Sequence, residues 1–236
     1  MIDALSPNCE PRPSGRAIDM LVIHYTGMAT TAEAIARLRD PLAKVSAHYL
    51  IDEDGAIHRL VPEELRAWHA GVSCWRGARD VNDRSIGIEL ANPGHEFGYR
   101  PFPEAQMEAF RRLASDILRR HPIPARNVVG HSDIAPARKQ DPGELFDWKG
   151  LAAAGIGLWP FEDGAKGQGP APDLGHAGTG LRRIGYDVSS VHGASAEAVG
   201  AFQRHFRPAR IDGRVDEETL RLIRLYCWVL DKNADR

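Results

Sequence analysis

The order of apolar and polar segments predicts an α/β (α+β) protein with a mixed central β-sheet flanked by helices, followed by a small three-helix C-terminal domain. Segments 19–25, 46–51 and 85–92 read as strands, whereas 103–121 has the 3.6-residue period of an amphipathic helix. A stretch rich in glycine and proline follows, and after it only helical patterns occur. Strands mixed with helices therefore belong to the first part of the chain alone.

The composition is that of an ordinary folded protein. Thirty Lys and Arg balance thirty-two Asp and Glu among 236 residues, so we expect no nucleic-acid partner. Three cysteines without metal-type spacing indicate neither a disulfide framework nor a cysteine zinc site. The N-terminal residues lack a charged region followed by an apolar one, and no apolar run reaches the ~20 residues of a transmembrane helix. We therefore expect a cytoplasmic protein without a membrane span.

The first strand patterns place a histidine at the end of a buried strand. We expect residues 1–18 to be an irregular lead-in and 19–25 (DMLVIHY) to be a central strand that delivers His24. Residues 30–33 have the spacing of a capping box, which begins a short helix. Segments 46–51 and 56–61 flank a turn signal and predict a β-hairpin.

The middle of the chain alternates between a loop, a strand and a helix. Residues 66–79 show no period and predict a surface loop. In 85–92, alternation places Glu89 on the face opposite the apolar side chains. The helix predicted over 103–121 has an apolar stripe, formed by Met107, Phe110, Leu113, Ala114, Ile117 and Leu118.

The remainder predicts one more strand, a loop and a second domain. Residues 127–129 predict a strand that ends just before His131, prolines and glycine keep the following loop non-helical, and 146–151 predicts a helical turn. Glycine and proline in 159–175 indicate a linker. The predicted domains are therefore a catalytic domain over 1–158, that linker, and a helical domain over 176–236.

Residues 130–143 (GHSDIAPARKQDPG) combine groups that suit hydrolytic metal chemistry. His131 and Asp141, joined by His24, could supply the three protein ligands of a catalytic zinc site. Such a site lowers the pKa of water to about 7. Glu89 is then a candidate general base, and Lys139 a candidate stabiliser of an oxyanion.

Residue types alone leave other interpretations open. The chain has ten histidines, and a histidine at a strand end is more often hydrogen-bonded than metallated. His48 and His69 are equally eligible as ligands, and spacing does not choose among them. Lys139 with Asp141 could be an ordinary surface ion pair.

Five runs in one order carry a family resemblance: VIHYT, SAHYLIDEDG, AWHAG, NDRSIGIEL and GHSDIAPARKQDPG. Over residues 17–151 they resemble the zinc-dependent N-acetylmuramoyl-L-alanine amidases of the type-2 (AmpD/AmiD) family, which share their fold with peptidoglycan-recognition proteins. The resemblance implies one Zn²⁺ held by the ligands His24, His131 and Asp141, with Glu89 and Lys139 as catalytic residues. It makes His48 and His69 cleft-lining or structural residues and not ligands. The implied substrate contacts are Trp68, His69 and Asn82.

The C-terminal part resembles a three-helix peptidoglycan-binding domain. LRRIGYD, AVGAFQRHF and IDGRVDEETLRLI stand where that domain has its GY, FQ and DG patterns. Residues 190–193 (SVHG) replace the usual DG before the middle helix. A packing domain without a glycan groove, or a helix that docks a partner, is the alternative interpretation.

The resemblance implies an amidase that cleaves between N-acetylmuramic acid, or its 1,6-anhydro form, and L-alanine in peptidoglycan or muropeptides. A non-catalytic peptidoglycan-recognition protein and a zinc peptidase acting on the stem peptide are the alternatives. The segment between His24 and residue 46 is short, as in the envelope branch of the family, whereas the N-terminal residues indicate the cytoplasm. We expect a monomer whose partners are peptidoglycan fragments.

Overall fold

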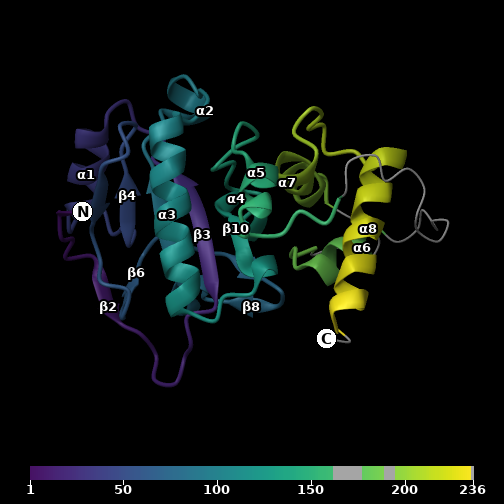
Figure 1. Ribbon diagram of the computed structural model, residues 1–236, viewed down its shortest axis with the longest axis horizontal. Helices are drawn as coiled ribbons and strands as arrows, with labels where there is room; N and C mark the ends of the chain where they lie inside the picture. The colour runs from purple at the N-terminus through teal and green to yellow at the C-terminus, as the bar shows by residue number, and fades with distance from the viewer. Residues whose placement is uncertain (162–176, 189–194, 235–236) are drawn as a thin grey trace.

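A six-stranded mixed sheet forms the centre of the first part of the chain (Figure 1). The computed structural model describes residues 1–161, 177–188 and 195–234. The sheet has the order β1-β5-β4-β9-β3-β10, and only the β4–β5 pair is antiparallel. Its strands are β1 (Ile2–Asp3), β3 (Met20–Tyr25), β4 (Tyr49–Ile51), β5 (Ile57–Arg59), β9 (Ser85–Leu90) and β10 (Val128–Gly130). The predicted mixed sheet is confirmed.

Helix α3 (Glu104–Arg120) covers one face of this sheet (Figure 1). Its predicted stripe is buried, apart from the partly buried Leu118, and packs on the face that Ile86, Ile88 and Leu90 present. Helix α1 (Thr31–Arg39) begins at the predicted capping box, with Thr30 as its N-cap, and buries Leu38 in a smaller cluster. Short helical segments complete this part: α2 (Gly94–Phe97), η1 (Val81–Arg84) and η2 (Ala125–Asn127).

Two expectations for the first part of the chain were wrong. The lead-in 1–18 contains β1 and β2 (Cys9–Pro11), and β2 pairs with β6 (Leu65–Ala67). The segment 66–79 is not a plain surface loop, because it holds β6 and the β7 (Cys74–Trp75) and β8 (Ala78–Arg79) ribbon. Trp75 is buried there beside the C-terminal helices. Long-range pairing and packing, which no local pattern reveals, order both segments.

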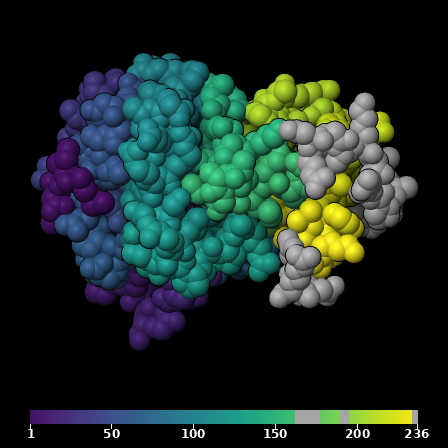
Figure 2. Space-filling model, in the orientation of Figure 1, coloured from purple at the N-terminus to yellow at the C-terminus, as the bar shows by residue number. Residues whose placement is uncertain are grey.

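The C-terminal helices pack against the edge of the sheet domain, as the continuous body in Figure 2 shows. Strand β10 leads into α4 (His131–Ile134), and α5 (Trp148–Ala153) follows as the predicted helical turn. Three helices form the C-terminal module: α6 (Ala177–Ile184), α7 (Ala196–Phe206) and α8 (Glu217–Ala234). One buried apolar cluster joins the two parts, including Val22, Val129 and Ile134 with Leu181, Phe202 and Tyr226.

Several local predictions are confirmed. The β4–β5 hairpin, strand β9 and the three C-terminal helices lie where the sequence placed them. Most of the predicted linker 159–175, and the SVHG segment 190–193, lie outside the described residues. No described helix is both long and apolar enough to cross a membrane.

Candidate metal centre and active-site cleft

The sheet brings distant side chains to one end of its central strands. His24 lies near the end of β3 and is the register partner of Glu89 on β9. On the other side of β3, the last residue of β10 is Gly130, so His131 begins α4 beside the same strand end. The backbone N–H of Ser132 donates to the carbonyl of Asp141 over 2.9 Å, which fixes the following loop against α4.

His24, His131 and Asp141 place three ligand atoms in a small triangle. The Nδ1 atoms of the two histidines are 2.9 Å apart, and each lies 3.0 Å from Oδ2 of Asp141. All three side chains are buried. No other group of three histidine, cysteine or acidic side chains within the described ranges converges in this way.

A chain of hydrogen bonds fixes where the proton of His24 lies. The hydroxyl of Ser85 donates to the carbonyl of Val81 over 2.7 Å, so Ser85 Oγ must accept from His69 Nε2 over 3.1 Å. Burial, followed by the charges of neighbouring imidazoles, lowers the pKa of His69 well below its ordinary value, so the ring is neutral. His69 Nδ1 then accepts from His24 Nε2 over 3.0 Å. The proton of His24 therefore points away from Asp141.

The imidazole of His131 is oriented like that of His24, with Nδ1 toward Asp141. His131 Nε2 faces the carbonyl of Ala70 over 3.1 Å, and a carbonyl can only accept. In the neutral ring that metal ligation requires, His131 Nδ1 is left without a proton. Two nitrogen lone pairs and a carboxylate oxygen then face one another at about 3 Å, an arrangement that a divalent cation relieves. The residues present fit a metal ion.

The electrostatics of the ligands agree with this geometry. Burial, followed by the charge of His131, lowers the pKa of His24 to about 4. Burial alone would raise the pKa of Asp141, but the two imidazoles lower it well below its usual range. At neutral pH, His24 is therefore neutral and Asp141 ionised, which are the protonation states that bind metals.

Glu89 and Lys139 reach the same cleft from different elements. Glu89 is half-buried, and its buried Oε2 has no hydrogen-bond partner among the described residues. Burial, followed by the charge of Asp141, raises the pKa of Glu89 well above its ordinary value, while the ammonium of Lys139 opposes this shift. A carboxyl with a raised pKa and an unsatisfied oxygen is suited to exchanging protons with a ligand.

A cavity of about 730 Å³ opens over these groups. Its walls include all five predicted metal and catalytic residues: His24, His131, Asp141, Glu89 and Lys139. Trp68 and His69 also line it. The structure thus brings seven of the eight predicted site residues to one space.

Asn82, the eighth predicted residue, lies elsewhere. Its side chain is buried, and Oδ1 accepts from the backbone N–H groups of His69 and Ala70, so it shapes the loop beneath the cavity. His48 is also buried away from the cavity, with Nδ1 accepting from the N–H of Gly87 over 2.9 Å. A side chain at Gly87 would meet the ring of His69, because a Cβ there would lie 2.5 Å from His69 Cγ.

Three further residues belong to the site although the sequence did not single them out as site residues. Ser85 ends the hydrogen-bond chain behind His24, but a serine at a strand start gives no local signal. Tyr25 and His95 line the cavity, and the Tyr25 hydroxyl lies 2.9 Å from His95 Nδ1. Tyr25 is part of the VIHYT run, whereas the helical turn that carries His95 follows no recognisable motif.

Comparisons with known proteins agree on one family. The family profile described as N-acetylmuramoyl-L-alanine amidase (Amidase_2) matches residues 14–144. N-acetylmuramoyl-L-alanine amidase AmiD of Escherichia coli is 42% identical over 222 residues, which cover 86% of this chain and 79% of AmiD. The 1,6-anhydro-N-acetylmuramyl-L-alanine amidase AmpD of Haemophilus influenzae is 37% identical over 162 residues, covering 61% of this chain and 86% of AmpD.

Two solved structures resemble the whole chain. The complex of E. coli AmiD with the substrate anhydro-N-acetylmuramic acid-L-Ala-D-γ-Glu-L-Lys has a TM-score of 0.80 at 38% identity, and covers 94% of this chain and 93% of that one. Pseudomonas aeruginosa AmpDh3 in complex with anhydromuramic pentapeptide has a TM-score of 0.79 at 35% identity, and covers 92% and 94%. Both similarities extend over the sheet domain and the C-terminal helices.

Proposed function

Because this chain belongs to the N-acetylmuramoyl-L-alanine amidase family, we propose that its metal centre cleaves the amide between N-acetylmuramic acid, or its 1,6-anhydro form, and L-alanine. The protein is an amidase of peptidoglycan turnover or recycling. The carrying observation is the triangle of His24, His131 and Asp141, in which three buried ligand atoms lie within 3.0 Å of one another. The ion we assign is a single Zn²⁺, since two imidazoles and one carboxylate are a common catalytic zinc set.

The ligand set is that of a catalytic and not of a structural zinc site. Three protein ligands are one fewer than a closed structural zinc site uses, so one position remains for solvent or substrate. When bound, zinc supplies a Lewis acid for the scissile carbonyl and makes water acidic enough to react near neutral pH. The hydrogen bond from His24 to His69 and that from His131 to Ala70 hold both imidazoles with Nδ1 toward Asp141, where the ion would be bound.

Glu89 is the proton carrier in this proposal. Glu89 lines the cavity beside the ligands, where its carboxyl can take a proton from the attacking water. The same carboxyl then protonates the departing amine of L-alanine. The raised pKa of Glu89 supports both roles, because a carboxyl that is too acidic is a poor base and a poor proton reservoir.

Lys139 is the cationic assistant. It lies two residues before Asp141 and lines the same cavity. Its ammonium opposes the rise in the pKa of Glu89, because the positive charge favours the ionised carboxylate. The charge of Lys139 therefore acts on the carboxyl that would exchange protons. A positive charge there stabilises the oxyanion that forms when the amide carbonyl is attacked.

The cavity is large enough for a muropeptide. Its volume of about 730 Å³ falls in the range of small-molecule sites. Trp68, half-buried at its edge, offers an indole face to a sugar ring or peptide. The AmiD and AmpDh3 complexes contain anhydromuramic peptides, and we propose the same substrate class here. The cytoplasmic location and the monomeric state expected above stay predictions.

The test is product identification. Zinc-loaded protein is incubated with anhydro-N-acetylmuramic acid carrying a tripeptide, and the products are analysed by mass spectrometry. We expect free tripeptide with L-alanine at its N-terminus, together with the free sugar acid. Shortened peptides still attached to sugar would indicate a peptidase, and an unchanged substrate bound by the protein would indicate a recognition protein. Either result would contradict the proposal.

A further inference from the structure

A second carboxylate, that of Asp133, lies in the helical turn that begins at the predicted ligand His131. Asp133 belongs to the single-turn helix α4, two residues after the ligand His131, and only 1% of its surface is exposed. Its Oδ2 accepts from the backbone N–H of Gly130 over 2.8 Å and so closes the turn that begins at His131. A buried carboxylate needs more than one such donor, because its charge is costly to remove from water.

The side chains that donate to Asp133 among the described residues come from the C-terminal module. The Tyr186 hydroxyl, just after α6, donates to Oδ1 over 2.6 Å. Nδ1 of His205, on α7, donates to Oδ2 over 2.8 Å. Burial, followed by the charge of Asp133, raises the pKa of Tyr186 well above its ordinary value, so the hydroxyl stays a donor. Both contacts join residues more than 50 positions apart in the sequence.

The imidazole of His205 is itself held in place. Its ring stacks on Trp148 of α5, with centroids 3.8 Å apart, and on the adjacent Phe206 at 3.9 Å. His205 and Tyr186 are both almost fully buried. Figure 1 shows α7 beside α4 and α5, at the junction of the two parts of the chain. The donors to Asp133 are therefore rigid, which is what orienting a neighbouring group requires.

We infer that Tyr186 and His205 are positioning residues of the metal centre: through Asp133 they hold the turn that aims His131 at the ion. The C-terminal module is then a structural part of the active site. Metal affinity depends on such indirect supports, since the ligand atoms must converge on one point. This inference rests on the proposed function in that it takes His131 to bind zinc.

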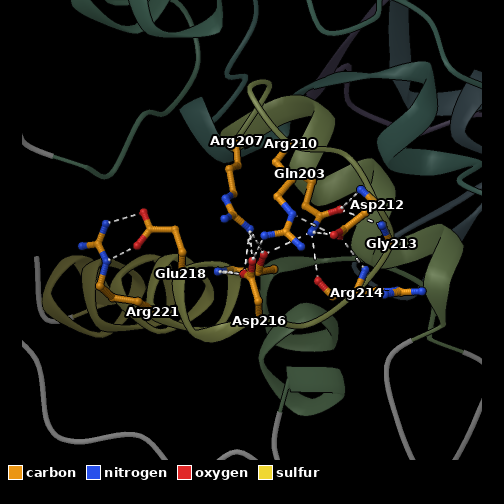
Figure 3. Close-up of polar contacts among 10 residues, drawn as sticks. Gln203, Arg207, Arg210, Asp212, Gly213, Arg214, Asp216, Glu218 and Arg221 are labelled. Carbon is orange, nitrogen blue, oxygen red and sulfur yellow. Dashed lines mark hydrogen bonds and ion pairs between the residues drawn. The ribbon is translucent and has the colours of Figure 1, made fainter.

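A plain packing role is the competing explanation, and the module offers a control for it. Gln203, two residues before His205 on α7, is fully buried in a network internal to the module (Figure 3). Its Nε2 donates to Asp212, to Thr219 and to the carbonyl of Arg214, while its Oε1 accepts from the N–H groups of Asp212 and Gly213. Gln203→Leu breaks this network without removing a contact to Asp133.

The experiment compares zinc affinity in full-length variants. Tyr186→Phe removes one donor and little volume, and His205→Leu removes the other. His205→Asn keeps an N–H close to the position of Nδ1. Zinc dissociation constants are measured by competition with a chromophoric chelator, absorption spectra are recorded after cobalt substitution, and thermal unfolding is followed for every variant.

We expect Tyr186→Phe and His205→Leu to bind zinc about 10-fold more weakly than the parent, with altered cobalt bands. His205→Asn should recover most of the affinity. Gln203→Leu should unfold at a lower temperature yet keep the parental affinity and spectrum. The inference is overturned when Tyr186→Phe and His205→Leu lose stability as Gln203→Leu does but retain parental affinity and cobalt bands. A parent protein that binds no zinc would instead contradict the proposed function, and this inference with it.

Discussion

His24 and Glu89 are direct register partners on the neighbouring parallel strands β3 and β9. Partners in register point to the same face of a sheet, so the backbone pairing itself sets a metal ligand beside a carboxyl that can exchange protons. The opposite face of β9 carries Ile86, Ile88 and Leu90, which pack under α3. The hydrophobic core thus fixes the register, and the register fixes the site.

Substitution of Glu89 separates metal binding from turnover. Glu89→Gln removes the proton acceptor while the three ligands stay in place. We expect one equivalent of zinc to be retained and turnover of the anhydro-muropeptide to fall by about 10²–10⁴, the usual contribution of a general base. Metal analysis and an initial-rate assay measure the two quantities. Parental turnover in Glu89→Gln would remove Glu89 from the mechanism.

The hydrogen-bond chain behind His24 predicts a graded loss of zinc affinity. His69→Phe keeps an aromatic ring against Gly87 but leaves the N–H of His24 without its acceptor. We expect about 10–100-fold weaker zinc binding, because partners of this kind orient the ligand and raise its basicity. Ser85→Ala, which removes only the outer end of the chain, should show a smaller loss of the same sign.

Chelator competition on both variants checks this prediction. If His69 only lined the cleft as a substrate contact, His69→Phe would raise KM and leave the zinc dissociation constant unchanged.

Loss of the Lys139 charge should lower turnover without changing the zinc content. In Lys139→Met the charge near the developing oxyanion is lost, and we expect turnover to fall by about 10²–10³, as when one oxyanion donor is removed. Zinc content should stay at one equivalent. Lys139→Arg restores the charge and should recover part of the rate. Steady-state kinetics on zinc-loaded protein test this, and an undiminished rate in Lys139→Met would contradict the role.

Glu63 gives the stability a defined pH dependence away from the site. Burial would raise its pKa, but hydrogen bonds from Arg120, His121 and Tyr49 lower it to about 2 from an ordinary value of 4.5. A carboxyl with a lowered folded-state pKa stabilises the fold above its unfolded value, and this stabilisation disappears as the pH falls from about 4.5 towards 2.

Glu63→Gln therefore should unfold more easily than the parent at pH 7, by on the order of 1 kcal/mol after solvent screening. Urea unfolding of both proteins at pH 7, 5 and 3.5 gives the difference in free energy of unfolding. We expect the difference in free energy of unfolding to shrink at the lowest pH. A difference that stays constant would show that the charge of Glu63 does not contribute.

Local patterns were sufficient for the features that repeat along the chain. The alternation in β9 placed Glu89 opposite the apolar face, and the period of α3 identified its buried stripe. The strand before His131 is one residue from the expected position, at Val128–Gly130. The structure brings the predicted ligands together because His24 and His131 lie at neighbouring strand ends of the sheet. The hydrogen bond from the N–H of Ser132 to the carbonyl of Asp141 then holds the loop that carries the third ligand against α4.

Features that depend on distant partners were not predictable in this way. Pairing of β2 with β6 joins segments more than 50 residues apart, and neither has a strong strand signal. Ser85 and Asp133 look like ordinary polar residues until His69, Tyr186 and His205 are folded onto them. Asn82 belongs to a recognisable run but turns its amide toward backbone N–H groups.

In the proposed metal centre, His24, His131 and Asp141 hold one zinc ion. Zinc K-edge X-ray absorption of the protein loaded with one equivalent tests it most directly, with His131→Ala measured in parallel. We expect two imidazole ligands and further oxygen ligands at about 2.0–2.2 Å in the parent, and loss of stoichiometric zinc in His131→Ala. Sulfur in the first coordination shell of the parent, or a parental spectrum in His131→Ala, would contradict it.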